Sequence, residues 1–222
     1  MRHIAVILAG GIGSRVGGST PKQLLPLADG RSILEHCVDA FEAAPSIGEI
    51  AVVMHSDHMI VLQQICEKNA WHKLTKIIPG GSERWQSSYN AIQAFKGTQD
   101  ASIWLHDAAR PFISEQIIAN VARALENHQA VTVAVPVTDT LYRTSENVVQ
   151  NVCDRSNFMR AQTPQAFHID VISDAFEKAL QNGTFIATDD VAILRQYRPD
   201  IPVFIVPGEE SNRKITYKED IQ

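Results

Sequence analysis

The chain alternates between short apolar runs and longer segments in which apolar residues recur at helical spacing. A short apolar run that ends at glycine or at polar residues is typical of a strand buried on both faces. The longer segments predict amphipathic helices, and Ser32 followed by Glu35 forms a capping box at the start of one of them. These patterns predict strands at residues 3–8, 50–54, 74–78, 102–105, 131–137 and 203–206, and helices at 32–44, 57–69, 87–95, 115–127, 169–180 and 189–196.

The alternation of strands and helices predicts an α/β fold, with a three-layer, mainly parallel, Rossmann-like sheet and right-handed crossovers. It breaks between residues 139 and 160, where two strand-like segments flank the polar turn Ser145-Glu146-Asn147. Strands joined by so short a turn pair as an antiparallel hairpin, so a β-hairpin arm is predicted to leave the sheet at 139–160. Because no repeat and no linker is present, residues 1–222 are predicted to form a single domain that carries this arm.

The composition narrows the function classes. The chain has 222 residues, of which 45% are hydrophobic, and this is enough for a large core. The net charge of -5 argues against a protein that binds nucleic acid through a basic surface. The N-terminal apolar run is too short for a signal peptide, and no run approaches the ~18 apolar residues of a membrane span. The expected location is therefore the cytoplasm, with no membrane association.

The cysteines and histidines do not predict a metal centre. Cys37, Cys66 and Cys153 are widely spaced and are predicted to be reduced thiols. His106, at the end of a predicted strand, is expected to be a packed histidine, whereas His55 is expected at the surface.

A glycine-rich loop over residues 8–22 follows the first predicted strand. Ligands of open parallel sheets bind at the carboxyl ends of the strands, so the loop is in the right place for a ligand. Gly10, Gly11 and Gly13 let backbone N–H groups approach phosphate oxygens, and Arg15 and Lys22 add positive charge. The loop therefore predicts a triphosphate site, the alternative being a plain turn with surface charges.

Other nucleotide sites fit the loop less well. The spacing does not supply a Walker P-loop, and Val16 stands where a dinucleotide fingerprint needs its third glycine. An NAD-type oxidoreductase is therefore disfavoured. A non-catalytic nucleotide-binding protein remains an alternative, although it would be expected to lack a phosphate-binding cation, and Arg15, Lys22 and Lys214 are all present.

Several motifs in order along the chain carry a family resemblance. They are LAGGIGSR with PKQ (8–15 and 21–23), GGSER leading to Ser87 (80–87), HDAARP (106–111), PVTDT (136–140), Asp154-Arg155, QTPQAF (162–167) and NRKIT (212–216). The chain resembles the 2-C-methyl-D-erythritol 4-phosphate cytidylyltransferase family of non-mevalonate isoprenoid synthesis, which has a nucleotidyltransferase fold. The resemblance implies transfer of a cytidylyl group from CTP to the phosphorylated alcohol, with release of pyrophosphate.

The resemblance also implies site residues. The nucleophile is a phosphate monoester with a second pKa of ~6, so it is already ionised and needs no general base. Catalysis would rest on positioning and charge stabilisation by Arg15, Lys22 and Lys214, with Mg²⁺ held by Asp107. The implied nucleotide-binding residues are Leu8, Ala9, Gly10, Gly11, Gly13, Gly81, Ser87, Asp107 and Ala108, and the implied residues for the polyol phosphate are Arg110, Thr140, Arg155 and Thr163. A homodimer is implied too, with each arm reaching over the partner's active site.

Leu8 departs from the family pattern, because many erythritol-phosphate enzymes have proline at this position. The LAGG start is also common in the sister family that activates ribitol 5-phosphate, while HDAARP and AQTPQ favour the erythritol branch. The expected acceptor is methylerythritol phosphate, and ribitol 5-phosphate is the alternative.

Overall fold

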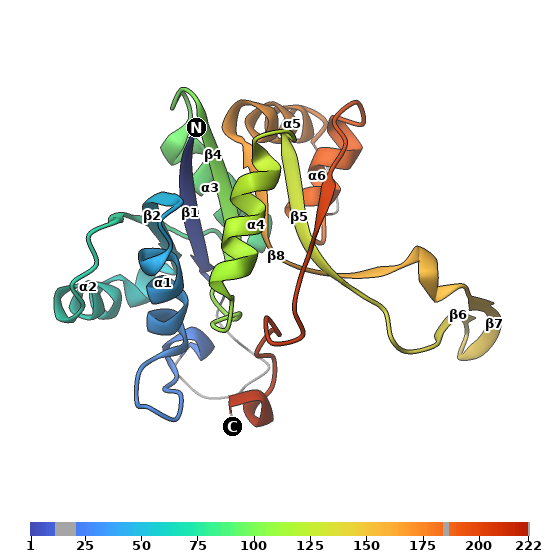
Figure 1. Ribbon diagram of the computed structural model, residues 1–222, viewed down its shortest axis with the longest axis horizontal. Coiled ribbons are helices and arrows are strands. Elements are labelled where there is room, and N and C mark those ends of the chain that lie inside the picture. The colour runs from blue at the N-terminus through green and yellow to red at the C-terminus, as the bar shows by residue number, and fades with distance from the viewer. Residues whose placement is uncertain (12–20, 184–186, 222) are drawn as a thin grey trace.

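A mixed seven-stranded sheet forms the centre of the molecule, with the strand order β3-β2-β1-β4-β8-β5-β9 (Figure 1). The structure is a computed structural model that describes residues 1–11, 21–183 and 187–221. Six of the seven strands run in one direction, which confirms the mainly parallel α/β fold. The strands are β1 (Arg2–Ala9), β2 (Ile47–Met54), β3 (Leu74–Pro79), β4 (Ala101–Asp107), β5 (Ala130–Pro136), β8 (Met159–His168) and β9 (Phe204–Pro207).

Strand β8 was not predicted from the sequence. It lies between β4 and β5 and is antiparallel to both, with Ala166 opposite Trp104 on one side and Val131 on the other. The predicted order, in which the helix at 169–180 follows the arm with no strand between them, therefore lacked one strand of the sheet. Polar residues and a proline interrupt the apolar run of β8, so its sequence does not look like that of a buried strand.

Helices cover both faces of the sheet, as expected for a three-layer fold (Figure 1). Helices α1 (Ile33–Ala43), α2 (Met59–Lys68) and α4 (Glu115–Leu125) pack on one face, in a core that includes Phe41 and Trp104. Helices α3 (Arg84–Phe95), α5 (Ile169–Gln181) and α6 (Asp190–Tyr197) pack on the other, around Ile103 and Phe176. Neighbouring residues of β4 thus point into opposite cores, as the pleat of a strand requires.

Side-chain caps set the starts of several helices. The predicted capping box of α1 is present: Ser32 Oγ accepts from the Glu35 N–H at 3.2 Å, and Glu35 Oε2 accepts from the Ser32 N–H at 2.8 Å. Helix α3 begins at Arg84, three residues before the predicted start at Ser87, because Glu83 acts as its N-cap. This earlier start brings Arg84 onto the first turn of a helix.

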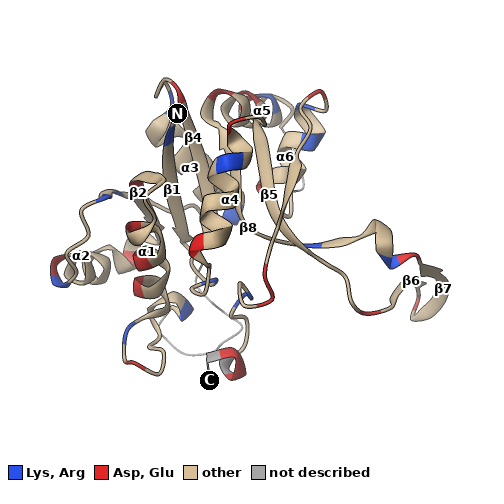
Figure 2. Cartoon of the chain, in the orientation of Figure 1, with Lys and Arg blue, Asp and Glu red and all other residues tan. Residues whose placement is uncertain are grey.

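The predicted arm is a separate two-stranded sheet of β6 (Leu141–Ser145) and β7 (Val148–Cys153), which extends from the body of the molecule (Figure 1). Its turn has φ of 49° at Glu146 and 62° at Asn147, the left-handed pair typical of a tight hairpin turn. Charged residues lie mainly on helices and loops, and the middle of the sheet carries few of them (Figure 2). In the described part of the chain, no helix is long and apolar enough to cross a bilayer.

Candidate active site

A cleft of about 410 Å³ opens at the carboxyl edge of the sheet, where β1, β2, β3 and β4 end. It gathers ten of the residues that the sequence predicts for a nucleotide site, namely Leu8, Ala9, Gly10, Gly11, Lys22, Gly81, Ser87, Asp107, Ala108 and Lys214. Two further predicted residues, Gly13 and Arg15, lie outside the described residues. The edge of the sheet at which the loop was expected to bind a ligand is therefore the edge that carries the cleft.

The glycines of the cleft allow two loops to pack closely. A Cβ atom built on Gly10 would lie 2.9 Å from Ser87 Oγ, and one on Gly81 would lie 2.2 Å from Gln86 Cβ. The Gly81 N–H donates to Ser87 Oγ at 3.1 Å, which ties the loop after β3 to the first turns of α3. A side chain at Gly81 would force this wall of the cleft to move.

The buried side chain of Gln23 holds the start of the glycine-rich loop by hydrogen bonds. Its amide Nε2 donates to the carbonyl oxygens of Ala9 at 2.5 Å and Gly11 at 3.1 Å. Because these two carbonyls are held by Gln23, the peptide groups at Ala9 and Gly11 have a defined orientation. In the sequence, Gln23 stands out only as part of the PKQ motif.

Two lysines from distant parts of the chain meet in the cleft. Lys22 lies in the short 3-10 helix η1 (Lys22–Leu24), and its Nζ donates to the carbonyl oxygen of Ile215 at 2.5 Å. Lys214 lies next to Ile215, and its Nζ donates to Asp107 Oδ2 at 2.7 Å. The cleft therefore has two positive charges on one side, close to a carboxylate at the end of β4.

Asp107 is held between two cations. Arg84 Nε lies 3.2 Å from its Oδ1, while Lys214 contacts its Oδ2. Burial alone would raise the pKa of Asp107, but Arg84 and Lys214 outweigh it and hold that pKa well below its ordinary range. Arg84 also contacts a second carboxylate, since its Nη1 lies 2.8 Å from Oδ2 of the fully buried Asp190. Burial would lower the pKa of Arg84, but Asp190 and Asp107 together raise it.

His106 is a packed histidine, as expected. It is fully buried on β4, with Phe41 edge-on to its ring. The Arg110 carbonyl can only accept, so His106 Nε2 donates to it at 3.1 Å, and Nδ1 of the neutral ring accepts from the Thr163 hydroxyl. The same hydroxyl accepts from the Asp107 N–H at 3.1 Å. Burial lowers the pKa of His106 to about 4, so the ring is neutral near neutral pH. His106 thus orients the Thr163 hydroxyl, which in turn holds the backbone N–H of Asp107.

The four residues expected to bind the second substrate are absent from the described lining of the cleft. Thr163 is buried under Asp107, and Arg110 donates from Nη1 to the Asn212 carbonyl at 2.8 Å, which ties the C-terminal segment to the β4 loop. Thr140 and Arg155 lie at the exposed base of the arm, where Arg155 Nη1 donates to the Thr138 carbonyl at 2.5 Å. A single chain therefore does not bring these four residues together in the lining of the nucleotide cleft.

Arg84 and His55 line the cleft but were not predicted to belong to it. His55 was expected at the surface; it is half-buried and follows β2. Arg84 was part of the GGSER motif but received no role, because the predicted helix began three residues later; only the structure puts this arginine in the first turn of α3, where the helix dipole disfavours a positive charge. Its partner Asp190 lies far along the chain, so the pair itself was not visible in the sequence. Among the described residues, no cluster of three His, Cys, Asp or Glu side chains could hold a metal.

Comparison with known proteins agrees with this geometry. The family described as "IspD: 2-C-methyl-D-erythritol 4-phosphate cytidylyltransferase" matches residues 3–222. The chain belongs to this family. It is 42% identical over 226 residues to the 2-C-methyl-D-erythritol 4-phosphate cytidylyltransferase of Thermobifida fusca (strain YX), covering 99% of this chain and 90% of that protein. The family assignment expected from the motifs is thus confirmed.

A solved cytidylyltransferase of this family has the same fold. The crystal structure of 4-diphosphocytidyl-2C-methyl-D-erythritol synthase from Anaerococcus prevotii DSM 20548 matches with a TM-score of 0.86 at 30% identity, covering 99% of this chain and 92% of that one. A more distant relative is the bifunctional ribulose 5-phosphate reductase/CDP-ribitol pyrophosphorylase Bcs1 of Haemophilus influenzae. It is 33% identical over 223 residues, which cover 99% of this chain but 47% of that protein.

Proposed function

We propose that this cytidylyltransferase transfers the cytidylyl group of CTP to the phosphate of 2-C-methyl-D-erythritol 4-phosphate, giving 4-diphosphocytidyl-2-C-methyl-D-erythritol and pyrophosphate. The observation that carries the proposal is the family match across residues 3–222. The cleft agrees with it, because it combines a glycine-lined wall with Lys22, Lys214 and Asp107. This product is an intermediate of non-mevalonate isoprenoid precursor synthesis.

The proposed reaction requires stabilisation of negative charge and does not require a general base. The acceptor phosphate, with a second pKa of ~6, is ionised near neutral pH and can attack the α-phosphorus of CTP directly. Negative charge then builds on the α-phosphate and on the departing pyrophosphate. Lys22 and Lys214 lie on the side of the cleft where they could stabilise this charge, and the sequence predicts that Arg15 adds a third cation.

Asp107 suits a magnesium site that is completed by the nucleotide. Mg²⁺ is commonly held by one or two carboxylates together with substrate phosphates, and each carboxylate oxygen of Asp107 has a lone pair beyond the one used by its cation. The bound ion would neutralise part of the triphosphate charge. The residues of the chain would hold Asp107 in place through Arg84 and through the Thr163–His106 hydrogen bonds.

The glycine wall suits the base and the ribose. This wall is formed by Ala9, Gly10, Gly81 and Ser87, which supply backbone N–H and C=O groups and one hydroxyl. Such donors and acceptors can hydrogen-bond with the edge of a pyrimidine. Leu8, Gly11 and Ala108 complete the lining beside them. The predicted contact of Gly13 belongs to the same loop.

The acceptor side is proposed to need a second subunit. Arg110, Thr140, Arg155 and Thr163 stay predictions for the polyol phosphate, as does the cytoplasmic location for the protein. In this proposal two chains form a homodimer, and the arm of one brings Thr140 and Arg155 to the cleft of the other. The exposed position of both residues on the arm supports this view, because a hairpin with apolar side chains in solvent gains stability when another surface covers it.

Ribitol 5-phosphate is the second candidate acceptor. Two observations favour keeping it, namely Leu8 in the LAGG start and the 33% identity to the Haemophilus influenzae CDP-ribitol pyrophosphorylase. Both acceptors are phosphate monoesters, so the same catalytic groups would serve either.

Release of pyrophosphate from CTP and Mg²⁺ tests the proposal. We expect release that depends on methylerythritol phosphate, with a lower kcat/KM for ribitol 5-phosphate. A higher kcat/KM for ribitol 5-phosphate would reverse the choice of acceptor. No release with either acceptor, while CTP still binds, would favour a non-catalytic nucleotide-binding protein.

A further inference from the structure

Lys214 has two anionic neighbours in the proposed complex but carries one positive charge. Its Nζ lies 2.7 Å from Asp107 Oδ2, whereas the proposed function needs this charge at the triphosphate. The Asp107 side chain is only 13% exposed, and a buried carboxylate without a counter-ion is strongly disfavoured. Lys214 can therefore leave Asp107 only if positive charge stays beside that carboxylate, and before Mg²⁺ arrives with the nucleotide this charge has to come from the chain itself.

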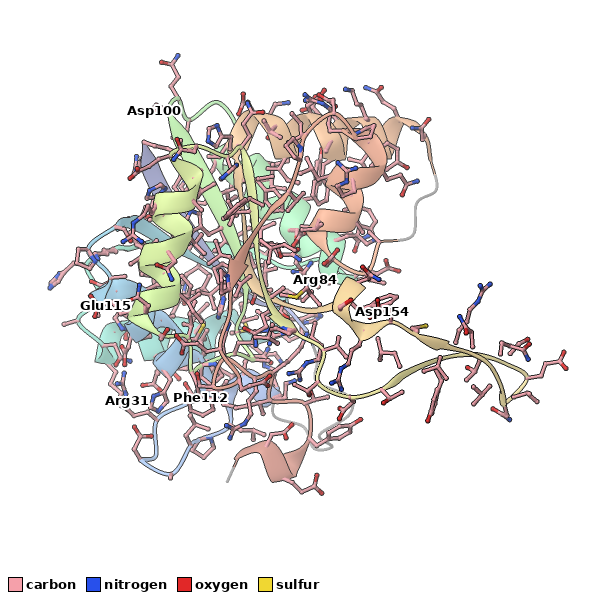
Figure 3. The ribbon with its side chains drawn as sticks, turned by 45° about the vertical axis from the view of Figure 1, so that its right-hand side comes forward. Arg31, Arg84, Asp100, Phe112, Glu115 and Asp154 are labelled. Atoms are coloured by element: carbon pink, nitrogen blue, oxygen red, sulfur yellow. The ribbon has the colours of Figure 1, made fainter. Side chains whose placement is uncertain are left out.

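Arg84 is placed to be that cation. Its guanidinium bridges two carboxylates, one at the end of β4 and one at the start of α6. Nε lies 3.2 Å from Asp107 Oδ1, and Nη1 lies 2.8 Å from Asp190 Oδ2. The planar fork of arginine suits such a bridge better than the single point charge of lysine. Arg84 is labelled near the middle of the molecule, away from peripheral residues such as Asp100 and Glu115 (Figure 3).

Asp190 is in turn fixed by the fold. It is the first residue of α6 and is fully buried; burial raises the pKa of Asp190, whereas the Arg84 guanidinium and the positive end of the helix dipole favour its carboxylate form. Its backbone N–H donates to Gln165 Oε1 at 3.0 Å, and Gln165 Nε2 donates to Asp189 Oδ2 at 2.7 Å. The start of α6 is thereby tied to β8, so the partner of Arg84 is held by hydrogen bonds to the sheet.

Lys214 is held less firmly than Arg84. Its side chain is 44% exposed, against 29% for Arg84, and it comes from an irregular segment rather than from a helix. A flexible lysine that contacts one carboxylate can turn toward a phosphate, whereas Arg84 is restrained by carboxylates at both ends of its guanidinium.

We infer that Arg84 and Asp190 form a positioning pair, in which Asp190 holds the Arg84 guanidinium on Asp107 so that Lys214 is released to the triphosphate when CTP binds. The inference rests on the proposed function, which supplies the triphosphate. Arg84 then acts through Lys214 and Asp107 and needs no contact with the reacting atoms.

The double variant Arg84→Met/Asp190→Leu tests the pair. It removes both charges together and leaves apolar side chains of similar size, a replacement that folded proteins often tolerate. In the otherwise unchanged enzyme we expect weaker CTP binding by calorimetry and a lower kcat, each by about tenfold or more. In a Lys214→Met background we expect the same double variant to lower both quantities by a clearly smaller factor, because no lysine remains to be released and the remaining loss comes only from Asp107 left without a cation.

The controls separate this role from general support of the fold. Glu49→Gln disrupts the ion pair of another buried carboxylate, whose partner at 2.6 Å is the half-exposed Arg2, at the amino ends of the parallel strands. It should lower the unfolding temperature without changing kcat. Asp190→Asn, which keeps the shape of the side chain, is measured in both backgrounds as well, so that the same comparison is made if the double variant does not fold.

Equal losses in the two Lys214 backgrounds would overturn the inference, because a purely structural pair would act independently of Lys214. Failure of the proposed function would look different. The unsubstituted enzyme would then release no pyrophosphate, while the coupling between Lys214 and the Arg84–Asp190 pair would still be measured in CTP binding.

Discussion

Asp107 is the residue at which the charges of the cleft converge. Its carboxylate contacts Arg84 and Lys214, and its backbone N–H donates to Thr163 Oγ1. Each contact comes from a different part of the chain, so the position of Asp107 depends on the whole fold around it. An aspartate that followed a predicted strand was visible in the sequence, but its partners were not.

Lys214→Met tests the importance of this charge at the residue scale. Loss of one preorganised cation that stabilises developing phosphate charge is expected to lower kcat/KM by roughly 10²–10³-fold. The fold should persist, because Arg84 still pairs with Asp107. Steady-state pyrophosphate release and the unfolding temperature measure the two effects.

Lys178→Met is the matched control for this variant. Lys178 is a lysine on α5 that pairs with Asp174 at 2.9 Å, and it is absent from the lining of the cleft. We expect its kcat/KM to stay near that of the unsubstituted enzyme. If Lys214→Met behaved like Lys178→Met, Lys214 would have no role in phosphate stabilisation.

At the scale of the element, the loop after β3 depends on having no side chain at Gly81. Gly81→Ala places a Cβ only 2.2 Å from Gln86 Cβ, far inside contact distance, so the loop or the start of α3 must shift. We expect KM for CTP to rise by roughly tenfold or more, equivalent to ~1.4 kcal/mol of lost binding. Gly48→Ala is the control, since its Cβ would meet Arg2 Cγ at an ordinary 3.6 Å. An unchanged KM in Gly81→Ala would show that this wall does not contact CTP.

The capping box of α1 gives a stability prediction with a defined pH range. Burial would raise the pKa of Glu35, but hydrogen bonds from Ser32 and Asn69 and the charge of Lys68 outweigh it and lower the pKa from 4.5 to about 2. A carboxylate with a lowered pKa stabilises the fold above its unfolded pKa, and this stability is lost as pH falls from 4.5 toward about 2. Glu35→Gln should therefore cost about 1–2 kcal/mol of unfolding free energy near neutral pH and less below pH ~4.

Urea unfolding of Glu35→Gln at several pH values measures this difference. The exposed Glu67, for which Glu67→Gln should have little effect at any pH, is the control on the neighbouring helix α2. A constant difference between Glu35→Gln and the unsubstituted protein across the pH range would contradict the assigned role of the Glu35 charge.

The elements that could be predicted from the sequence are those whose apolar residues follow one period. Strands such as β1 and β2, and helices such as α1, bury side chains in a regular pattern, so local rules found them. Strand β8 failed because its buried polar residues are satisfied by distant groups: Gln165 bonds with Asp189 and the backbone of Asp190, and Gln162 donates to the Glu209 carbonyl at 2.8 Å. Such partners cannot be identified from the local sequence.

The same reason limits the prediction of the site. The motifs located the glycine wall, Lys22, Asp107 and Lys214, because these residue types suit a triphosphate at the end of parallel strands. They did not locate Arg84, whose position depends on Asp190 in a helix formed much later in the chain. Residues such as Arg84, whose role is to pair with other charged side chains, could therefore be identified only from the structure.

At the scale of the whole molecule, the arm is the feature that most needs a partner. Its apolar side chains are largely exposed, with Tyr142 and Val152 each 58% accessible and directly opposite each other on the hairpin. Asp154 marks the side on which the arm rejoins the body (Figure 3). The proposed homodimer would cover this surface.

Tyr142→Asp/Val152→Asp tests the dimer. Charges on the covered face of an arm are expected to shift the chain from dimer to monomer in sedimentation velocity, while the circular dichroism of the sheet and helices is retained. Activity should fall with the dimer, because the proposed site takes Thr140 and Arg155 from the partner. A fully active monomer would contradict shared active sites.

Direct competition between acceptors tests the central claim most directly. The enzyme is incubated with CTP, Mg²⁺ and equal concentrations of methylerythritol phosphate and ribitol 5-phosphate, and the products are resolved by ³¹P NMR and mass spectrometry. The account predicts that 4-diphosphocytidyl-2-C-methyl-D-erythritol is the main product, formed together with pyrophosphate. CDP-ribitol as the main product, or no cytidylylated alcohol at all, would contradict it.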